Sequence, residues 1–293
     1  MYQTTLRNAC HVRGTGLHSG AATEVTLLPA PPDSGVRFRV RRGSRVVEVP
    51  ASLAHVNRTE LSTCLARDGV EICTVEHLLA ALRGLEIDNV SVLTHGPEVP
   101  VMDGSALPFV KALAGAGRRM QPVARKSLRM LAPLRVEAGD KFAELLPSAL
   151  PVYAFEIDYP HPAIGRQALS LRLTPQTFVA EVAAARTFGF EADMHQLQQR
   201  GLALGGSLET AVGLGCDGTV LNPEGLRFPD EFVRHKILDA VGDLSLFGLP
   251  IQAEYRGRKS GHTLNLKLLQ ALAEHPDRWE VVSAETAQSA QAV

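Results

Sequence analysis

The sequence contains no long hydrophobic run and no recognisable export signal. No apolar stretch among its 293 residues approaches the roughly 18 residues that a membrane-spanning helix needs. Residues 1–20 lack the charged start, apolar middle and small-residue cleavage site of a signal peptide. We therefore expect a cytoplasmic protein without stable membrane insertion.

Cysteine is scarce, and the cysteines that are present are scattered. None of them forms a CxxC pair; they are Cys10, Cys64, Cys73 and Cys216. This spacing favours neither a disulfide framework nor a zinc site built from thiolates. Because we expect a reducing compartment, we predict that all four are free thiols.

The sequence also lacks an excess of charge of either sign. Lys and Arg number 30 and Asp and Glu number 31, which argues against a protein that binds nucleic acid through a basic field. There is no GxSxG nucleophile elbow and no HExxH, and residues 14–20 miss the GxGxxG spacing by one residue. The serine hydrolases of that type, the commonest zinc peptidases and a dinucleotide site are therefore unsupported.

The composition is that of an ordinary globular protein, with 45% hydrophobic and 21% charged residues. The length favours two domains. A stretch with Gly and Arg at 115–126, which includes Pro122, is the predicted boundary. This gives an N-terminal domain of residues 1–122 and a C-terminal domain of residues 123–293, and an α+β fold class.

Local patterns predict the elements within each half. Alternating apolar residues between turn signals predict strands at 22–29, 35–40, 90–93, 127–131, 141–146 and 153–159. Helical periodicity and cap residues predict helices at 74–84, 105–114, 175–185 and 232–247. The glycine-rich stretch 201–218 is either a functional insert or an ordinary connection. The tail from Ser283 is expected to fray.

The helix predicted at 232–247 carries the most informative polar pattern. His235, Asp239 and Asp243 recur every four residues, on a different face from the apolar stripe. Successive members of such a row lie about 6 Å apart, so an imidazole and a carboxylate can converge on one ion. A solvated face with a His–Asp pair is the alternative explanation for this helix alone.

Two further histidines stand in suggestive places. His77 follows Glu76 at the first turn of a predicted helix, where the helix dipole favours the neutral imidazole that binds metals. His262 follows a Ser-Gly turn and is expected on a loop, where an imidazole of near-neutral pKa suits a general acid. Taken alone, a helix-start Glu and a surface His are ordinary explanations for both.

Together these residues make up the set that a catalytic zinc centre needs. His77, His235 and Asp239 are three ligands that leave a fourth position open, Glu76 is a carboxylate for the water, and His262 is an acid. A structural zinc site would instead favour four closed ligands, usually with Cys. We therefore predict a zinc hydrolase.

Seven motifs in one order resemble a known family. They are GLHSG at 16–20, TVEHL at 74–78, IDN at 87–89, MDGS at 102–105, ARTFGF at 185–190, FVRHKILD at 232–239 and KSGH at 259–262. From about residue 3 to about residue 282, the chain resembles the UDP-3-O-acyl-N-acetylglucosamine deacetylases, zinc enzymes of lipid A synthesis in Gram-negative bacteria. The resemblance implies two similar layered α/β domains, each a sheet with two helices, and helices packed between the sheets.

The resemblance also implies a reaction. It is hydrolysis of the 2-acetamido group of UDP-3-O-(3-hydroxyacyl)-N-acetylglucosamine to the free amine and acetate, the committed step of lipid A biosynthesis. One Zn²⁺ per chain would bind His77, His235 and Asp239, with Fe²⁺ as an alternative metal in the cell. The enzyme would be a monomer that acts on a UDP-sugar with an acyl chain and binds no nucleic acid.

Roles for single residues follow from the same resemblance. Glu76 would be the general base, His262 the general acid oriented by Asp243, and Thr187 a hydroxyl that helps to hold the oxyanion. Two lysines are candidates for the diphosphate, namely Lys236, which we expect to point off the zinc side because it directly follows His235, and Lys259. The acyl passage is assigned to Phe188, Met194, Ala203 and Leu208.

A few positions depart from the family pattern. Ser62 stands where a Cys is often found, the pair 209–210 is Glu-Thr where an Asp-Asn type is commoner, Gly213 interrupts an aliphatic strand, and Leu266 replaces a second Asn after Asn265. These departures bear on acyl-chain preference. They leave a zinc amidohydrolase for a different acetamido sugar as the alternative, whereas a non-catalytic relative is disfavoured because Glu76 and His262 are both present.

Overall fold

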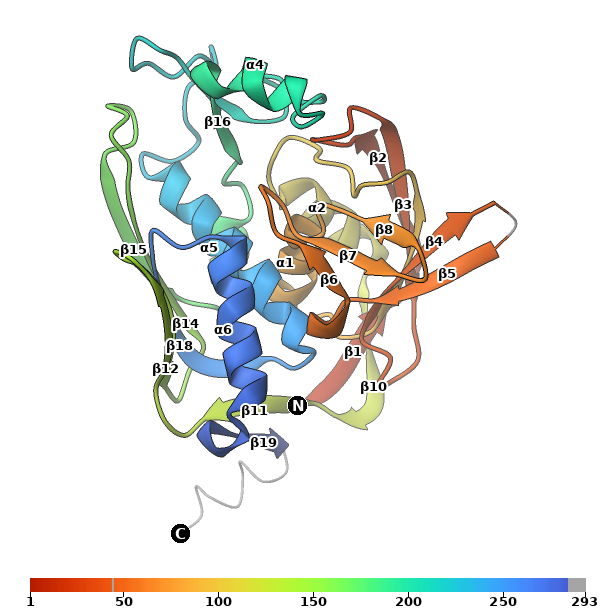
Figure 1. Ribbon diagram of the computed structural model, residues 1–293. Helices are drawn as coiled ribbons and strands as arrows, with labels where there is room; N and C mark the ends of the chain where they lie inside the picture. The colour runs from red at the N-terminus through yellow and green to blue at the C-terminus, as the bar shows by residue number, and fades with distance from the viewer. Residues whose placement is uncertain (44, 284–293) are drawn as a thin grey trace.

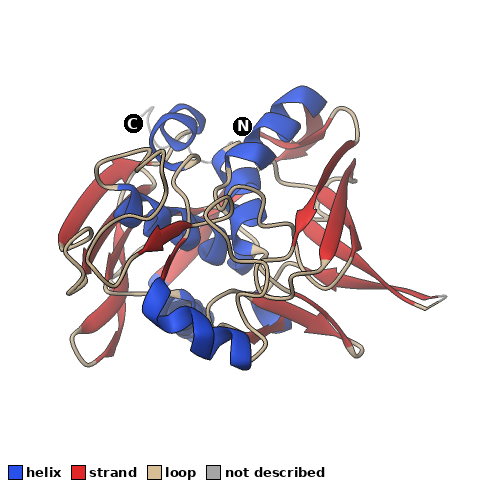
Figure 2. Cartoon of the chain, turned by 90° about the horizontal axis from the view of Figure 1, so that it is seen from above, coloured by secondary structure: helices blue, strands red, loops and turns tan. Residues whose placement is uncertain are grey.

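The structure is a computed structural model, and it describes residues 1–43 and 45–283 of the chain. The predicted tail after Ser283 lies outside the described residues. Two β-sheets stand at opposite sides of the molecule, and the main helices lie between them (Figure 1). The view from above in Figure 2 shows the same arrangement. The predicted α+β class, with helices packed between two sheets, is confirmed.

The N-terminal half is built on a five-stranded sheet. Its strands, in spatial order, are β2 (Cys10–Thr15), β3 (Ala22–Pro29), β9 (Val90–His95), β4 (Val36–Arg42) and β5 (Arg45–Pro50). Helices α1 (Glu76–Gly84) and α2 (Leu107–Ala116) cover its inner face. A smaller sheet of β6 (Val56–Arg58), β7 (Cys64–Arg67) and β8 (Val70–Ile72) leads directly into α1.

The C-terminal half repeats this layering with a seven-stranded sheet. Five strands form a path in the order β12 (Leu134–Ala138), β13 (Lys141–Pro147), β18 (Ile251–Arg258), β11 (Lys126–Met130) and β19 (Trp279–Ser283). The strand β14 (Val152–Asp158) pairs with β18 and with β15 (Arg166–Arg172). Alternate residues of β14, Tyr153, Phe155 and Ile157, are buried, as a sheet with one core face requires. Helices α5 (Glu231–Leu244) and α6 (His262–Glu274) lie against it.

Connections complete the fold. The strand β1 (Tyr2–Leu6) pairs with β10 (Arg118–Ala124), and the predicted domain boundary after residue 122 falls within β10 and stays a prediction. A segment above the helices holds β16 (Phe188–Phe190), α4 (Glu191–Gln199) and β17 (Val212–Leu214). None of the helices in residues 1–43 and 45–283 has the length and apolar character of a membrane span.

Several local predictions were incomplete. The helix expected at 175–185 is a short α3 (Pro175–Thr177) that continues as a wider π-helical turn, η2 (Phe178–Val182). His262, expected on a loop, is instead the first residue of α6. This prediction was wrong because the apolar stripe of this helix, which is buried against the core, begins only at Leu264. The Ser-Gly turn before His262 therefore gave no sign that a helix starts there.

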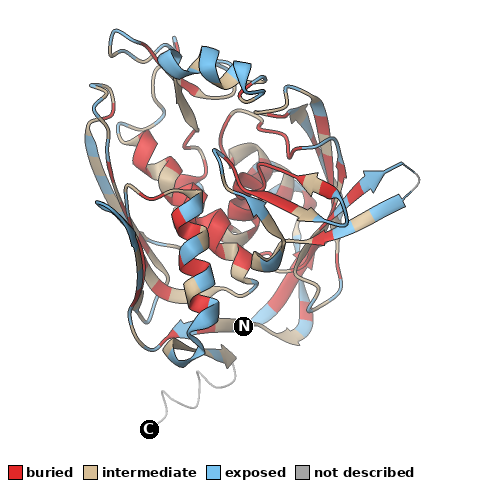
Figure 3. Ribbon diagram, in the orientation of Figure 1, coloured by how far each residue is buried: buried red, intermediate tan, exposed pale blue. Residues whose placement is uncertain are grey.

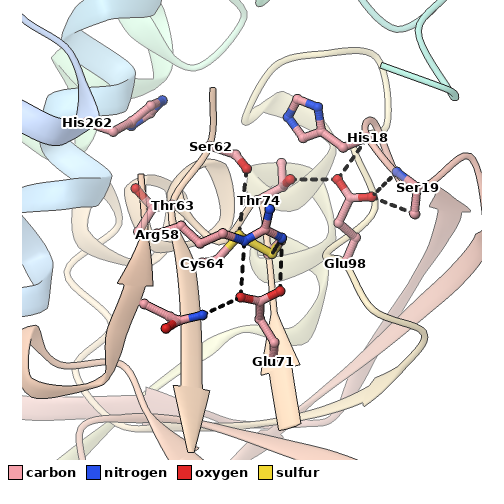
Figure 4. The surroundings of a disulfide bond; sticks show 12 residues. His18, Ser19, Arg58, Ser62, Thr63, Cys64, Glu71, Thr74, Glu98 and His262 are labelled. Atoms are coloured by element: carbon pink, nitrogen blue, oxygen red, sulfur yellow. Dashed lines mark hydrogen bonds and ion pairs between the residues drawn. A yellow bond between two sulfur atoms is a disulfide. The ribbon is translucent and has the colours of Figure 1, made fainter. Parts of the chain in front are cut away.

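The prediction of four free thiols was also wrong. Cys64 and Cys73 form a disulfide, while Cys10 and Cys216 are free. The two bonded residues lie at the open ends of the β7–β8 hairpin, where the register pairs Leu65 with Ile72, and their Cα atoms are 4.0 Å apart (Figure 4). Nine residues of sequence separation carry no disulfide signal, because only the strand register brings these side chains together.

Removing this disulfide should destabilise the protein. For a closed loop of this length, the loss of chain-entropy restraint predicts that Cys64→Ala/Cys73→Ala lowers the free energy of unfolding by about 2–3 kcal/mol. Urea unfolding under oxidising conditions measures the difference in the free energy of unfolding. Adding dithiothreitol should lower the free energy of unfolding of the wild type towards that of the double variant. Equal stability of the two proteins without reductant would contradict the disulfide.

Helices α1 and α5 make the closest approach between the two halves. The burial colouring in Figure 3 shows both helices mostly buried, and twelve of the fourteen residues of α5 are buried. Gly242 faces the backbone of Glu76, and a Cβ atom at position 242 would lie 2.1 Å from the Glu76 carbonyl oxygen. Glycine is therefore required here by the close approach of the two helices.

Gly242→Ala should be strongly destabilising. The added methyl group meets main chain that cannot swing aside, so we expect a loss of about 1–3 kcal/mol or more in the free energy of unfolding. Gly115→Ala is the matched control, because it also adds a methyl group to a helical glycine but meets nothing within 4 Å. That control should be neutral or slightly stabilising in the same urea titration.

Candidate metal centre

The first turn of α1 is fixed to a neighbouring loop. Thr74 precedes the helix with a φ of 56°, and its hydroxyl donates a hydrogen bond to Glu98 Oε1 at 2.7 Å. Glu98 also accepts hydrogen bonds from two amides of the loop 16–20, at 3.0 and 2.8 Å. The carboxylate therefore ties the loop to the start of α1, which presents Glu76 and His77.

Three side chains from α1 and α5 converge at one buried point. His235 Nε2 lies 3.3 Å from Asp239 Oδ1, and His77 Nε2 lies 3.7 Å from the same oxygen. One donor atom from each of these three residues lies within 4.8 Å of the other two. All three are at most 3% exposed. The HxxxD spacing on α5 thus brings His235 and Asp239 together, and the close approach of α1 to α5 places His77 beside them.

The donor set of this cluster fits a divalent cation. The His235 Nδ1–H donates to the Ala185 carbonyl oxygen at 3.1 Å, which leaves Nε2 unprotonated towards the cluster. Asp239 Oδ1 is buried and has no hydrogen-bond partner among the described residues. Burial lowers the pKa of His77 to about 3, so its imidazole is neutral. Two neutral imidazoles and one carboxylate form a set of ligands that suits Zn²⁺.

A carboxylate and an imidazole lie beside the cluster. His262 Nε2 is 3.9 Å from Glu76 Oε1, and His262 Nδ1 donates to Asp243 Oδ2 at 2.9 Å. Burial opposes the charged form of His262, but Asp243 outweighs it and raises the pKa of His262 to about 10. Burial raises the pKa of Glu76 to about 8, against the opposing effect of His262. The pair combines a candidate proton acceptor with a candidate donor.

Two residues that the sequence reasoning missed hold these carboxylates. Thr63 donates its amide to Glu76 Oε2 at 3.1 Å and its hydroxyl to Asp243 Oδ1 at 2.7 Å. Asn265 donates to Asp243 Oδ2 at 2.8 Å. Thr63 precedes the disulfide residue Cys64, and Figure 4 shows it beside the hairpin. Asn265 follows His262 by one helical turn, a spacing that could have indicated it.

The cluster opens into a cavity of about 540 Å³. Glu76, His77, His235, Asp239 and His262 all line it. Thr187 also lines it, on a segment held by a buried ion pair in which Arg186 Nε donates to Glu231 Oε1 at 2.9 Å. No sequence motif predicted this ion pair, which fixes the Thr187 backbone next to the N-terminal end of α5.

The two candidate lysines differ in their surroundings. The expectation that Lys236 points off the metal side was wrong: its Nζ donates to Asp239 Oδ2 at 2.8 Å. Three residues along a helix lie on one side, and the long side chain bends back to the buried carboxylate. Lys259 pairs at the cavity rim with Asp140 and Asp158, at 2.9 and 3.0 Å. Both lysines line the cavity.

The residues assigned to the acyl passage are not all brought together. Phe188 lines the cavity, packed edge-on against Phe232 with ring centroids 5.1 Å apart. Met194, Ala203 and Leu208 lie on α4 and the loop after it and are not among the cavity-lining residues. Apolar residues that do line the cavity are Leu17, Leu61, Phe190 and Leu197. The acyl passage assigned to Phe188, Met194, Ala203 and Leu208 stays a prediction.

The fold and the site define a class of protein: an α+β chain with a buried two-histidine, one-aspartate cluster beside a carboxylate–imidazole pair. Comparison with known families narrows this class. The family model for UDP-3-O-acyl N-acetylglycosamine deacetylase matches residues 3–274. The chain belongs to this family, and the resemblance noted from its motifs is confirmed.

Curated relatives agree over nearly the whole length. The chain is 48% identical to the UDP-3-O-acyl-N-acetylglucosamine deacetylase of Histophilus somni, over 97% of this chain and 93% of the relative. It is 48% identical to the protein of that name from Pseudomonas entomophila, over 98% and 95%. The Myxococcus xanthus relative of the same name is 47% identical, over 96% and 90%.

Asn265 should be needed to hold the site together. It also accepts hydrogen bonds from the Tyr255 hydroxyl at 2.7 Å and the Ser260 hydroxyl at 3.0 Å. Asn265→Leu therefore removes the acceptor of two buried hydroxyls and one of the donors to Asp243. We expect a loss of roughly 2–4 kcal/mol in the free energy of unfolding, measured in urea. Thr263→Val, which removes an exposed hydrogen bond to Thr59, is the matched control and should stay within about 0.5 kcal/mol of wild type.

Proposed function

We propose that the protein is a zinc-dependent deacetylase that hydrolyses the 2-acetamido group of UDP-3-O-(3-hydroxyacyl)-N-acetylglucosamine. The products are the free amine and acetate. The proposal includes one Zn²⁺ per monomer, with Fe²⁺ as an alternative in the cell, and a cytoplasmic role in the lipid A synthesis of a Gram-negative bacterium. The single observation that carries it is the convergence of His77, His235 and Asp239 beside the Glu76–His262 pair in one cavity.

The proposed metal ligands are His77, His235 and Asp239. When bound, Zn²⁺ polarises the amide carbonyl and lowers the pKa of a water molecule. The orphaned oxygen of Asp239 supports this assignment, because a buried carboxylate oxygen without a donor is costly unless a cation faces it. Lys236 already occupies the other oxygen of Asp239, which leaves Oδ1 for the ion.

Proton transfer is assigned to the remaining pair. Glu76 takes the proton of the attacking water as general base, and His262 delivers a proton to the nitrogen of the leaving amine. Asp243 accepts the Nδ1–H of His262, which orients the ring and keeps it protonated. Separate groups for the two transfers are needed because the amine must leave protonated while the water is deprotonated. The Thr187 hydroxyl is assigned a hydrogen bond to the oxyanion.

The chemistry of the cavity wall supports a UDP-sugar that carries an acyl chain. Four lysines line the cavity, and they are Lys141, Lys236, Lys259 and Lys267. Cationic groups of this kind suit a diphosphate. Phe188, Phe190 and Leu197 give an apolar side on which an acyl chain can lie. Lys141 and Lys267 join the earlier candidates, and Lys259 is the weaker of these because two aspartates already pair with it.

Acetate release from the proposed substrate tests the function. We expect activity that disappears with a chelator and returns with Zn²⁺, and Glu76→Gln should lower kcat by about 10²–10⁴-fold. Glu274→Gln, which removes an exposed carboxylate outside the cavity, is the matched control and should keep wild-type activity. Metal content, measured on both variants, separates loss of the base from loss of the ion.

Two results would count against the proposal. Zinc bound at one equivalent without acetate release, across several acyl lengths, would reject the substrate and favour an amidohydrolase for another acetamido sugar. Full activity in Glu76→Gln would reject the role of the carboxylate.

A further inference from the structure

A second cavity lies at the other end of α1. The helix begins with Glu76 and ends at Gly84, and Arg83 and Gly84 line a cavity of about 350 Å³. Its other walls come mainly from β14 and the loop before it, from residues 172–175, and from residues 244–252, which run from the end of α5 to the start of β18. None of the residues to which we assign a role in deacetylation lines it.

Arg83 is a cationic group in the wall of this cavity without an ion-pair partner among the described residues. Its guanidinium is partly buried, and no oxygen in residues 1–43 and 45–283 accepts a hydrogen bond from it. Burial, with the charge of Arg125 second, lowers the pKa of Arg83 to about 10. A guanidinium has five N–H donors, and holding it partly out of water without an acceptor is unfavourable. Arg83 also lines a neighbouring cavity of about 400 Å³.

Tyr153 adds a second donor without an acceptor. The residue is 6% exposed, and its hydroxyl has no hydrogen-bond partner within the part of the chain that the structure describes. Burial raises the pKa of Tyr153 to about 12, against a smaller opposing effect of Arg83. The hydroxyl is therefore protonated and available as a donor near the guanidinium.

The side chains around the cavity leave it positive. Arg125 is paired with Asp88 at 2.8 Å and with Glu86 at 3.4 Å, so its charge is offset. Arg83 and Arg172 line the cavity without such a partner among the described residues. Glu86 is also paired with Arg118 at 3.4 Å, so Arg118 and Arg125 together balance Asp88 and Glu86. The C-terminal ends of α1 and α5 each contribute about half a negative charge, and with Arg83 and Arg172 this leaves about one positive charge around the cavity.

Apolar residues form the rest of the wall. Leu150, Pro151, Leu173 and Leu249 all line the cavity. Polar donors at one place and apolar surface beside it are the usual features of a small-molecule site. An oxyanion can accept from a guanidinium with two oxygens at once, so a carboxylate or a phosphate group matches Arg83.

We propose that this cavity binds a small anionic ligand in which a carboxylate or phosphate group is attached to a short apolar body. The oxyanion accepts hydrogen bonds from Arg83 and Tyr153, and the apolar body lies against the leucine and proline residues. The proposal does not depend on the deacetylase function, because the two cavities share no lining residue.

Titration calorimetry of the full-length protein tests it with four probes. Hexanoate and hexyl phosphate carry the two anionic groups, hexanol carries the same apolar body without charge, and inorganic phosphate carries the charge alone. We expect one of the first two to bind with a Kd below about 1 mM, and hexanol to bind at least tenfold more weakly. Comparison of hexanoate with hexyl phosphate decides between a carboxylate and a phosphate ligand. Inorganic phosphate should bind more weakly than the better of these two. Failure of both hexyl anions at about 10 mM overturns the proposal.

Variants locate the site. Arg83→Met keeps the apolar stem of the side chain and should weaken binding at least about tenfold, and Tyr153→Phe about threefold. Arg41→Met is the matched control, because Arg41 is an exposed arginine outside the cavity, and it should leave Kd unchanged. Binding should also persist after chelation and in the presence of UDP.

Three outcomes would place the ligand elsewhere and reject the site: equal affinity in Arg83→Met, loss of binding with the metal, or competition by UDP. If Arg83→Met fails to fold by circular dichroism, Tyr153→Phe decides, since it keeps the ring. Unchanged affinity in a folded Tyr153→Phe would then overturn the proposal.

Discussion

The contact between Gly242 of α5 and the backbone of Glu76 in α1 sets the geometry of the whole site. No side chain fits between the helices there, so their backbones meet and the polar faces on both sides of the contact come within bonding range. His77 reaches Asp239 only because of this crossing. The two outer sheets hold the crossing by burying the apolar faces of the same helices. A site assembled from two halves of the chain thus depends on one close approach.

The charges at this crossing explain why so many polar partners surround it. Glu76, Asp239 and Asp243 are all at most 3% exposed, and three carboxylates so close together repel one another. Asp243 is stabilised by donors from Thr63, His262 and Asn265. Within the described residues, Asp239 accepts a hydrogen bond only from Lys236, and its other oxygen faces two neutral imidazoles. A cation at that point would complete the balance, so the buried arrangement is better suited to the metal-loaded state.

The sequence predicted what depends on local spacing and missed what depends on register. His235 and Asp239 are one helical turn apart, and Glu76 and His77 are adjacent. Local spacing was therefore enough to predict both parts of the cluster. Thr63 and the Cys64–Cys73 disulfide depend on how β7 and β8 pair, which no local pattern fixes. Lys236 was misplaced because its sequence position sets the direction of its Cβ, whereas its four-carbon chain can still bend towards Asp239. The family resemblance supplied roles that spacing alone left open.

The two cavities lie at opposite ends of the same pair of helices, which connects them physically. Glu76 and His77 lie at the start of α1, and Arg83 lies in its last turn. Asp239 and Asp243 lie on α5, and Ser245, directly after α5, lines the same cavity as Arg83. Helix α1 has nine residues and is about 13 Å long. A ligand that shifted either helix at this end would change the distances between the proposed metal ligands. Thermodynamic linkage makes the effect reciprocal: any change in metal affinity caused by the ligand is matched by an equal change in the affinity for that ligand when the metal binds. The contact at Gly242 would carry such a shift from one helix to the other, because main chain meets main chain there with no side chain between them.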